Sequence, residues 1–135
     1  MKARGFSLIE MLIVITIIGT LAGLMLPNLL KSQDKAKETS VKAVLHAFQT
    51  ALESYNVDTL AYPAGTNLSA KGLYDILATD GYLKTAPVNP FTGKAYEDGD
   101  EAGKILYSLN SSTGLYTLTG YKRNGSTVLM TLTNS

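Results

Sequence analysis

The sequence predicts an α+β fold in which a long N-terminal helix packs against a small C-terminal antiparallel sheet of about three strands. Three features support this prediction. The residues from Met11 to Leu30 carry no charge, and a helix of that length can cross the ~30 Å core of a bilayer. Residues 31–57 continue a helical pattern with one apolar face. Residues 104–133 contain short alternating segments that are separated by turn residues.

Composition limits the classes of function. The chain has 135 residues, which is the length of one domain. Its formal net charge of +1 argues against nucleic-acid binding as the main role, because phosphate contacts need a basic face. It has no cysteine, which excludes disulfides, thiolate metal sites and a cysteine nucleophile. Because no catalytic triad, phosphate-binding loop or histidine metal spacing stands out, the sequence predicts a protein that is not an enzyme.

The N-terminal segment combines two basic residues, a long apolar run and one acidic residue. Lys2 and Arg4 precede the apolar run and would hold the N-terminus in the cytoplasm by the positive-inside rule. The segment differs from a secretory signal peptide, whose apolar region has only about 7–15 residues. Glu10 lies inside the run, where an isolated carboxylate costs several kcal/mol. We therefore expect Glu10 to be protonated, to reach the headgroups or to find a cation.

Residues 5–10, GFSLIE, resemble the processing site of a type IV prepilin or a type II secretion prepseudopilin. In that family a short basic leader ends in glycine, as at Gly5, and is followed by Phe6 and by Glu10 as the fifth mature residue. The resemblance implies that a membrane prepilin peptidase cleaves after Gly5 and that the new amino terminus of Phe6 is N-methylated. The Phe6 amine of a neighbouring subunit is then a partner for Glu10. The alternative is that Glu10 faces the lipid headgroups.

Gly19, Gly23 and Pro27 complete the candidate assembly residues. Gly19 and Gly23 are four residues apart, which permits close approach of another helix in a membrane. Pro27 cannot donate a hydrogen bond to the carbonyl of Gly23 and should kink or loosen this turn. The resemblance implies a partly unwound region here in related filaments. The alternative is an ordinary transmembrane helix that tolerates these residues.

Residues 31–57 continue the helix without glycine or proline. Apolar side chains recur at spacings of three and four and therefore form one stripe. The stripe consists of Val41, Val44, Leu45, Phe48, Ala51, Leu52 and Tyr55. The C-terminal half of the chain must cover it.

The sequence pattern after residue 57 predicts a loop, a short helix and strands. Residues 58–68 form the loop, and Ser69 is expected to cap a helix that ends near Asp80. Asn124 and Gly125 are a signal for a two-residue hairpin turn. The expected strands are residues 104–110, 115–121 and 126–133.

The connecting loop resembles that of major pseudopilins and related simple pilins in two places. Tyr62-Pro63 follows the long helix, and Asn89-Pro90-Phe91 precedes a tyrosine at position 96. Thr92 separates Phe91 from the next glycine, which departs from the family pattern.

Four acidic residues follow this loop: Glu97, Asp98, Asp100 and Glu101. Oxygen-rich loops of this kind can hold calcium, and the alternative is a solvated acidic turn. The resemblance implies calcium in major pseudopilins, but in an acidic loop nearer the C-terminus, and residues 121–126 contain no acid here. No cofactor is therefore expected, with calcium as the one candidate.

The sequence predicts a leader at 1–5, a transmembrane and polymerisation helix at 6–30, an amphipathic continuation at 31–57 and a globular head at 58–135. The resemblance implies a structural subunit that polymerises through its N-terminal helix into a type IV pilus-like filament. The alternative is the major pseudopilin of a type II secretion system, a periplasmic piston for protein export. The small cysteine-free head and the connecting loop favour the pseudopilin, whereas the missing C-terminal acidic loop favours the pilin.

The resemblance also implies partners and locations. The partners are other copies of the chain in a helical filament, a prepilin peptidase, an inner-membrane assembly platform with a cytoplasmic ATPase, minor pilins or pseudopilins, and membrane lipid before assembly. The protein would span the inner membrane once and then enter an extracellular pilus or a periplasmic pseudopilus. A rival from another class is an anchored binding domain that never polymerises. DNA uptake by a competence filament is a further use of the fold, but no basic patch stands out.

Overall fold

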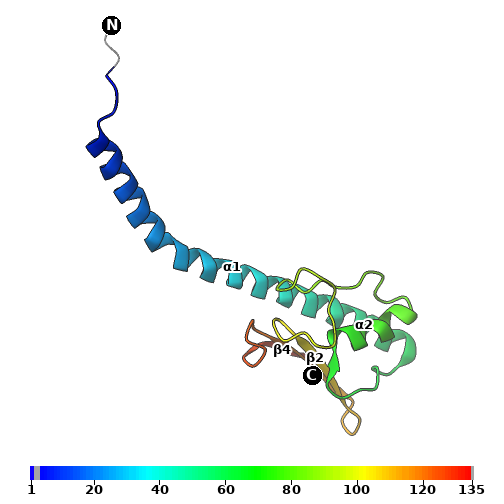
Figure 1. Cartoon of the computed structure of the whole chain (residues 1–135). Coiled ribbons are helices and arrows are strands. Elements are labelled where there is room, and N and C mark those ends of the chain that lie inside the picture. The colour runs from blue at the N-terminus through cyan, green and yellow to red at the C-terminus, as the bar shows by residue number, and fades with distance from the viewer. Residues whose placement is uncertain (2–3, 135) are drawn as a thin grey trace. The chain divides into compact units, whose positions relative to one another are not determined.

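The computed structural model describes Met1 and residues 4–134 and divides the chain into two compact units, Met1–Lys35 and Ala36–Ser135. We call these the N-terminal unit and the C-terminal unit. The secondary structure elements are α1 (Leu8–Thr59), β1 (Leu68–Ser69), α2 (Ala70–Thr79), β2 (Ile105–Asn110), β3 (Leu115–Tyr121) and β4 (Val128–Thr133) (Figure 1). A long apolar N-terminal helix and a small antiparallel sheet confirm the predicted α+β fold.

The C-terminal half of α1 buries the predicted apolar stripe. Val41, Leu45, Phe48, Ala51 and Leu52 are buried, because a side chain recurs on the same helix face every three or four residues. About three turns of the helix thus present one continuous apolar face to the rest of the C-terminal unit.

The sheet has four strands in the order β1-β2-β3-β4, and each neighbouring pair is antiparallel. The sequence predicted about three strands, so the count was wrong by one. The additional strand, β1, has only two residues, of which Leu68 pairs with Tyr107 and Ser69 with Leu106. Two residues are too few to show an alternating pattern, and this strand exists because the chain lies beside β2 just before α2 begins.

The connection from β3 to β4 is longer than the predicted two-residue turn. The backbone N–H of Lys122 donates to the carbonyl of Thr127 at 2.9 Å, which leaves four residues between them. A type I′ turn needs positive φ at both central residues, whereas of this pair only Gly125 has it, with φ of 66°. Asn124 instead uses its side-chain oxygen to accept from the backbone N–H of Thr127 at 2.9 Å. The side chain of Asn124 therefore closes a wider loop.

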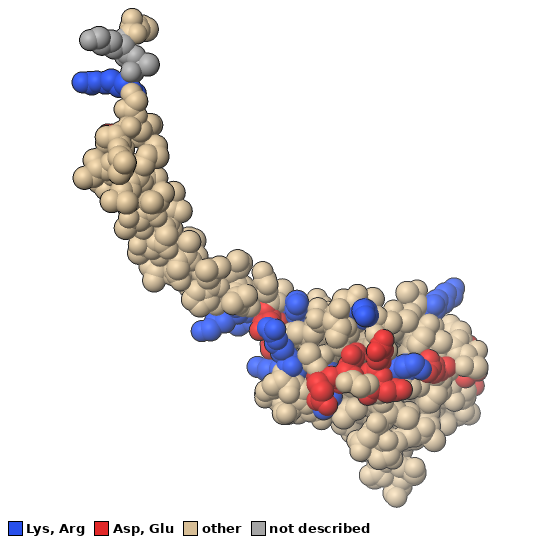
Figure 2. Space-filling model, in the orientation of Figure 1, with Lys and Arg blue, Asp and Glu red and all other residues tan. Residues whose placement is uncertain are grey.

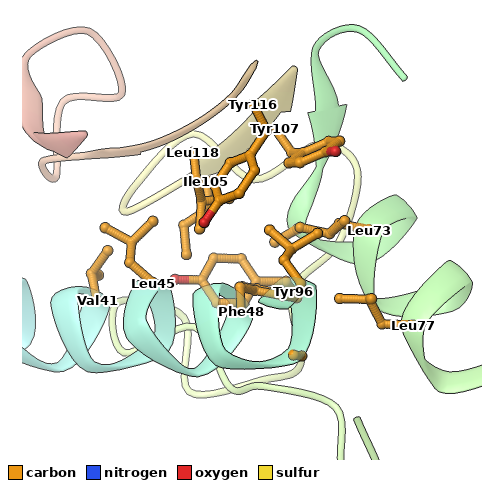
Figure 3. Close-up of a cluster of buried hydrophobic side chains, with 13 residues drawn as sticks. Val41, Leu45, Phe48, Leu73, Leu77, Tyr96, Ile105, Tyr107, Tyr116 and Leu118 are labelled. Carbon is orange, nitrogen blue, oxygen red and sulfur yellow. The ribbon is translucent and has the colours of Figure 1, made fainter. Parts of the chain in front are cut away.

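Side chains from four sources converge in the core of the C-terminal unit (Figure 3). Helix α1 contributes its stripe, and α2, the inner face of the sheet and Tyr96 of the connecting loop lie against it. The labelled members are Val41, Leu45, Phe48, Leu73, Leu77, Tyr96, Ile105, Tyr107, Tyr116 and Leu118. This packing confirms that the sheet covers the helical stripe.

Gly120 in β3 lies close to side chains of α1. A Cβ atom at this position would lie 2.6 Å from Cδ1 and 3.3 Å from Cγ of Leu45, and 3.4 Å from Cγ1 of Val41. The absence of a side chain at Gly120 therefore allows the backbone of β3 to rest on α1.

The start of α2 follows the sequence prediction. The Oγ of Ser69 accepts a hydrogen bond from the backbone N–H of Gly72 at 3.0 Å, and the helix ends at Thr79 with Asp80 as its C-cap. A serine cap satisfies one of the N–H groups that have no partner within the first turn of a helix.

Glu53 of α1 attaches the connecting loop and the sheet to the helix. Its carboxylate accepts hydrogen bonds from the hydroxyls of Tyr62 at 2.9 Å and Tyr116 at 3.0 Å. The two tyrosine rings lie edge to face with centroids 4.8 Å apart. The hydroxyl of Tyr107 donates to the carbonyl of Pro63 at 2.8 Å. The Tyr62-Pro63 segment is thus held from both sides.

Candidate functional site

The predicted cleavage point lies just before α1. Gly5 and Phe6 are exposed and have no regular secondary structure, and the helix begins at Leu8. A Cβ atom at Gly5 would meet nothing within 4 Å. Arg4 of the expected leader is also exposed, whereas Lys2 lies outside the described residues. An exposed peptide bond outside a helix is open to a peptidase.

Glu10 forms a capping box with Ser7 at the start of α1. The backbone N–H of Ser7 donates to Oε2 of Glu10 at 2.7 Å, and the backbone N–H of Glu10 donates to Oγ of Ser7 at 3.2 Å. The two side chains thus satisfy two backbone donors reciprocally. Such donors are costly to leave without a partner in hydrocarbon. Ser7 was not among the predicted site residues, although a serine three residues before a glutamate is the sequence signature of this cap.

The polar side chains deeper in the apolar stretch find partners within the helix. The hydroxyl of Thr16 donates to the carbonyl of Leu12 at 2.7 Å, and that of Thr20 donates to the carbonyl of Thr16 at 2.8 Å. Bonds of this kind to the preceding turn let hydroxyls enter an apolar environment without losing their hydrogen bonds.

The candidate packing residues lie on an open helix surface. Cβ atoms built at Gly19 and Gly23 would meet nothing within 4 Å. Helix α1 includes Pro27 and continues to Thr59, so no helix end interrupts this region in the single chain. The loosening expected at Pro27 stays a prediction for the assembled state.

Between Met11 and Leu30, the large apolar side chains are exposed all around α1. Figure 2 shows only uncharged side chains on the visible face of this stretch. By length and composition, α1 can cross a membrane. A soluble domain would bury such a surface, since apolar area exposed to water is unfavourable.

The Asn-Pro-Phe segment of the connecting loop is built around a buried asparagine. Asn89 is fully buried, and its Nδ2 donates to Oδ2 of Asp100 at 3.0 Å and to the carbonyl of Ala102 at 2.9 Å. Its Oδ1 accepts from the backbone N–H of Phe91 at 3.0 Å. Asn89 therefore joins the connecting loop to the acidic residues that follow, which the sequence alone did not indicate.

The acidic residues 97–101, here called the acidic turn, each meet a different partner or face water. Asp98 accepts a hydrogen bond from the hydroxyl of Ser69, and Glu101 forms an ion pair with Lys104 at 3.2 Å. The side chain of Glu97 is exposed. Among Met1 and residues 4–134, no three Asp, Glu or His side chains converge in a group that could hold a metal ion. The four predicted candidates line one small cavity, but no three of them converge closely enough to hold a metal ion.

Comparisons with known proteins agree with these features. Residues 1–26 match a family model described as a prokaryotic N-terminal methylation motif. The type II secretion system core protein G of Pseudomonas aeruginosa is 34% identical over 125 residues, which covers 82% of this chain and 84% of that protein. Its counterpart in Escherichia coli is 36% identical over 99 residues, which covers 67% of this chain and 68% of that protein.

A relative with a different role is similar over most of its length. The type IV wide pilus major component of Thermus thermophilus is 33% identical over 117 residues, which covers 85% of this chain and 87% of that protein. No solved structure matches the chain significantly. The methylation motif, the apolar helix and these similarities together show that the chain belongs to the family of type IV pilins and type II secretion major pseudopilins.

Proposed function

We propose that this chain is a structural subunit of a type IV pilus-like filament, and that it polymerises through α1 after a prepilin peptidase cleaves between Gly5 and Phe6. The observation that carries the proposal is the exposed apolar surface of α1 from Met11 to Leu30, preceded by the single acid Glu10. Such a surface needs lipid before assembly and other helices afterwards. Family membership supports this use of the surface.

The role proposed for Glu10 follows from its position. In the single chain its carboxylate accepts from the backbone N–H of Ser7, which reduces but does not remove the cost of a charge near hydrocarbon. Cleavage after Gly5 creates an amine on Phe6, and its N-methylation keeps the positive charge. The amine of one subunit pairing with Glu10 of its neighbour offsets the desolvation of both groups. This pairing would align each incoming subunit with the last one.

Gly19 and Gly23 are proposed to receive a neighbouring helix, because their Cα atoms carry no side chain that would hold it away. Pro27 cannot donate a backbone hydrogen bond and weakens the helix locally. A weakened turn at Pro27 would let α1 adjust its length or direction when subunits pack together.

A second candidate function is the major pseudopilin of a type II secretion system. The specific observation in its favour is that relatives named type II secretion system core protein G cover most of the chain at 34% and 36% identity. The pilus component from Thermus thermophilus is similarly related at 33% identity. Both functions use the same helix and the same assembly step, and they differ in the length and location of the filament.

The proposed partners follow from this assembly step. They are other copies of the chain, a prepilin peptidase, an inner-membrane platform with a cytoplasmic ATPase, and minor pilins or pseudopilins. Before assembly the chain would span the inner membrane once with its N-terminus in the cytoplasm. It would then enter an extracellular pilus or a periplasmic pseudopilus. No enzymatic activity, cofactor or nucleic acid forms part of the proposal.

The test compares filaments sheared from cells that produce the wild-type chain, Glu10→Ala or Glu10→Gln. Glutamine at this position keeps the capping box, since its carbonyl also accepts from the N–H of Ser7, but it cannot pair as an anion. Glu97→Ala is the matched control, because Glu97 is exposed in the C-terminal unit. The readouts are electron microscopy of the sheared material, membrane retention of the subunit and the intact mass of the subunit in the filaments.

We expect wild type and Glu97→Ala to yield filaments of a chain that begins at N-methylated Phe6. Both Glu10 variants should be retained in the membrane without filaments. If Glu10→Gln assembles normally, the carboxylate acts only as a cap and the pairing proposal is wrong. A processed chain that stays with the envelope in short assemblies would favour the pseudopilin, whereas a chain that functions unprocessed would contradict both readings.

A further inference from the structure

We propose that the ammonium group of Lys104 takes the place of a metal ion beside the acidic turn, so that the C-terminal unit of this chain folds without calcium. The fold family implies calcium in a loop nearer the C-terminus, and the residues of this chain do not fit that ion. This inference concerns the C-terminal unit alone and does not depend on how α1 polymerises.

The loop that would hold the ion supplies no carboxylate. Residues 121–126 contain two basic residues, Lys122 and Arg123, and no acid. Calcium in proteins takes 6–8 oxygen ligands, typically with several carboxylates among them. The loop between β3 and β4 lacks this charge.

The acidic turn lies against this loop but does not complete a site for it. The backbone N–H of Gly103 donates to the carbonyl of Lys122 at 3.1 Å, so the two segments are in contact. A Cβ atom at Gly125 would lie 2.5 Å from Oε2 and 2.8 Å from the backbone oxygen of Glu101. The backbone at Gly125 therefore packs directly on Glu101 on this side of the turn.

The carboxylates of the turn are already used by protein donors. Asp100 accepts from Nδ2 of the buried Asn89 at 3.0 Å and from the backbone N–H of Glu97 at 3.1 Å. Asp98 accepts from the hydroxyl of Ser69. An ion bound through these same oxygens would compete with these donors, one of which belongs to a fully buried side chain that cannot turn to water.

The partly buried side chain of Lys104 supplies a positive charge next to the carboxylates of the acidic turn. Its Nζ lies 3.2 Å from Oε2 of Glu101, and its side chain is only 26% exposed. The same Nζ lies 5.2 Å from the ring centroid of Tyr121, a distance at which a cation is attracted by an aromatic face. Lys104 therefore joins the acidic turn to the end of β3, as a metal ion would join two loops.

The surroundings of Lys104 suit a positive charge that stands in place of a metal ion. A small cavity of about 140 Å³ is lined by Lys104, by Ser69 and by the acidic side chains of the turn. A second lysine, Lys71, has its pKa raised chiefly by its ion pair with Asp75 and also by the charge of Asp98. Figure 2 shows acidic and basic side chains next to one another on the visible face of the C-terminal unit. A divalent cation would be repelled by ammonium groups placed so close to the carboxylates.

The experiment measures thermal unfolding of the full chain in a mild non-ionic detergent, followed by the near-ultraviolet circular dichroism of its tyrosines. Each protein is measured in EDTA and in about 10 mM CaCl₂, which exceeds the Kd of weak extracellular calcium modules, about 10⁻³ M. The variants are Lys104→Met, which keeps the apolar stem, and Lys104→Arg, which keeps the charge. Lys84→Met is the control, because Lys84 is exposed and distant in sequence from the acidic turn.

We expect the Tm of the wild-type chain to be the same in EDTA and in calcium to within about 1 °C. A site filled at about ten times its Kd would instead raise Tm by about 6–11 °C. Lys104→Met should lower Tm in EDTA by about 2–6 °C, whereas Lys104→Arg and Lys84→Met should not. A wild-type Tm that rises with calcium overturns the proposal, even if Lys104→Met does not fold. An equal Tm for Lys104→Met and Lys84→Met also overturns it.

Discussion

Gly120→Ala is expected to destabilise the C-terminal unit, because β3 and α1 touch at this residue. The new Cβ atom would lie 2.6 Å from Cδ1 of Leu45, whereas carbon atoms pack best at about 3.5–4.0 Å. The Leu45 side chain must therefore move by about 1 Å, and it is fully buried in the core. The clash involves a side chain that has no solvent-filled space to enter.

The expected change in the free energy of unfolding for Gly120→Ala combines two opposing contributions. Inserting a methyl group into a packed core costs about 1–3 kcal/mol, while replacing a strand glycine by alanine returns about 0.5–1 kcal/mol through the backbone. The net loss should be about 1–2 kcal/mol. For a domain of this size it corresponds to a fall in Tm of about 5–15 °C.

A double-mutant cycle measured by thermal unfolding in detergent tests the cause. Leu45→Ala alone should cost about 2–5 kcal/mol, and in that background Gly120→Ala should be neutral or stabilising because the contacted atoms are gone. Gly99→Ala is the control, since a Cβ atom there would meet nothing within 4 Å. The reasoning is refuted if Gly120→Ala costs as much in the Leu45→Ala background as in the wild type, or if Gly99→Ala costs as much as Gly120→Ala.

Two further predictions concern buried tyrosines. Tyr116→Phe removes the hydroxyl that donates to Glu53 at 3.0 Å and should lower the unfolding free energy by about 1 kcal/mol; an unchanged melting curve would contradict this. Burial is the main cause that raises the pKa of Tyr96, Tyr107 and Tyr116 above the usual value of 10.0. Because the folded state holds these protons more tightly, their contribution to stability is complete below about pH 10 and is lost as the pH rises towards the folded pKa values. In an alkaline titration, part of the tyrosinate absorbance should therefore appear only at high pH, together with the loss of circular dichroism. If all tyrosines ionise near pH 10 while the chain stays folded, the link between tyrosine burial and stability is wrong.

Features set by local sequence could be predicted. The apolar stripe from Val41 to Leu52 follows helical periodicity, and the cap at Ser69 depends only on groups within the next three residues. The boundaries of β2 and β3 were predicted to within one residue for the same reason, since an alternating pattern between turn residues marks a strand.

Features set by distant partners could not be predicted. The hydroxyls that bind Glu53 come from residues 9 and 63 positions away, and the partners of Asn89 include groups 11 and 13 positions away. Nothing in the neighbouring sequence of Glu53 or Asn89 specifies those contacts. The same holds for β1, whose two residues become a strand only because β2 lies beside them.

The apolar side chains of α1 from Met11 to Leu30 would be shielded from water both in a bilayer and among packed helices. The hydrophobic free energy scales with the area removed from water, so for this segment it nearly cancels between the two states. Helices that leave lipid for one another gain little from hydrophobicity. Polymerisation would therefore be close to thermodynamically neutral along α1, and its direction would depend on the charge of Glu10, on contacts between C-terminal units and on external work. With so small a difference in free energy, a subunit of the proposed filament would return to the membrane nearly as readily as it left.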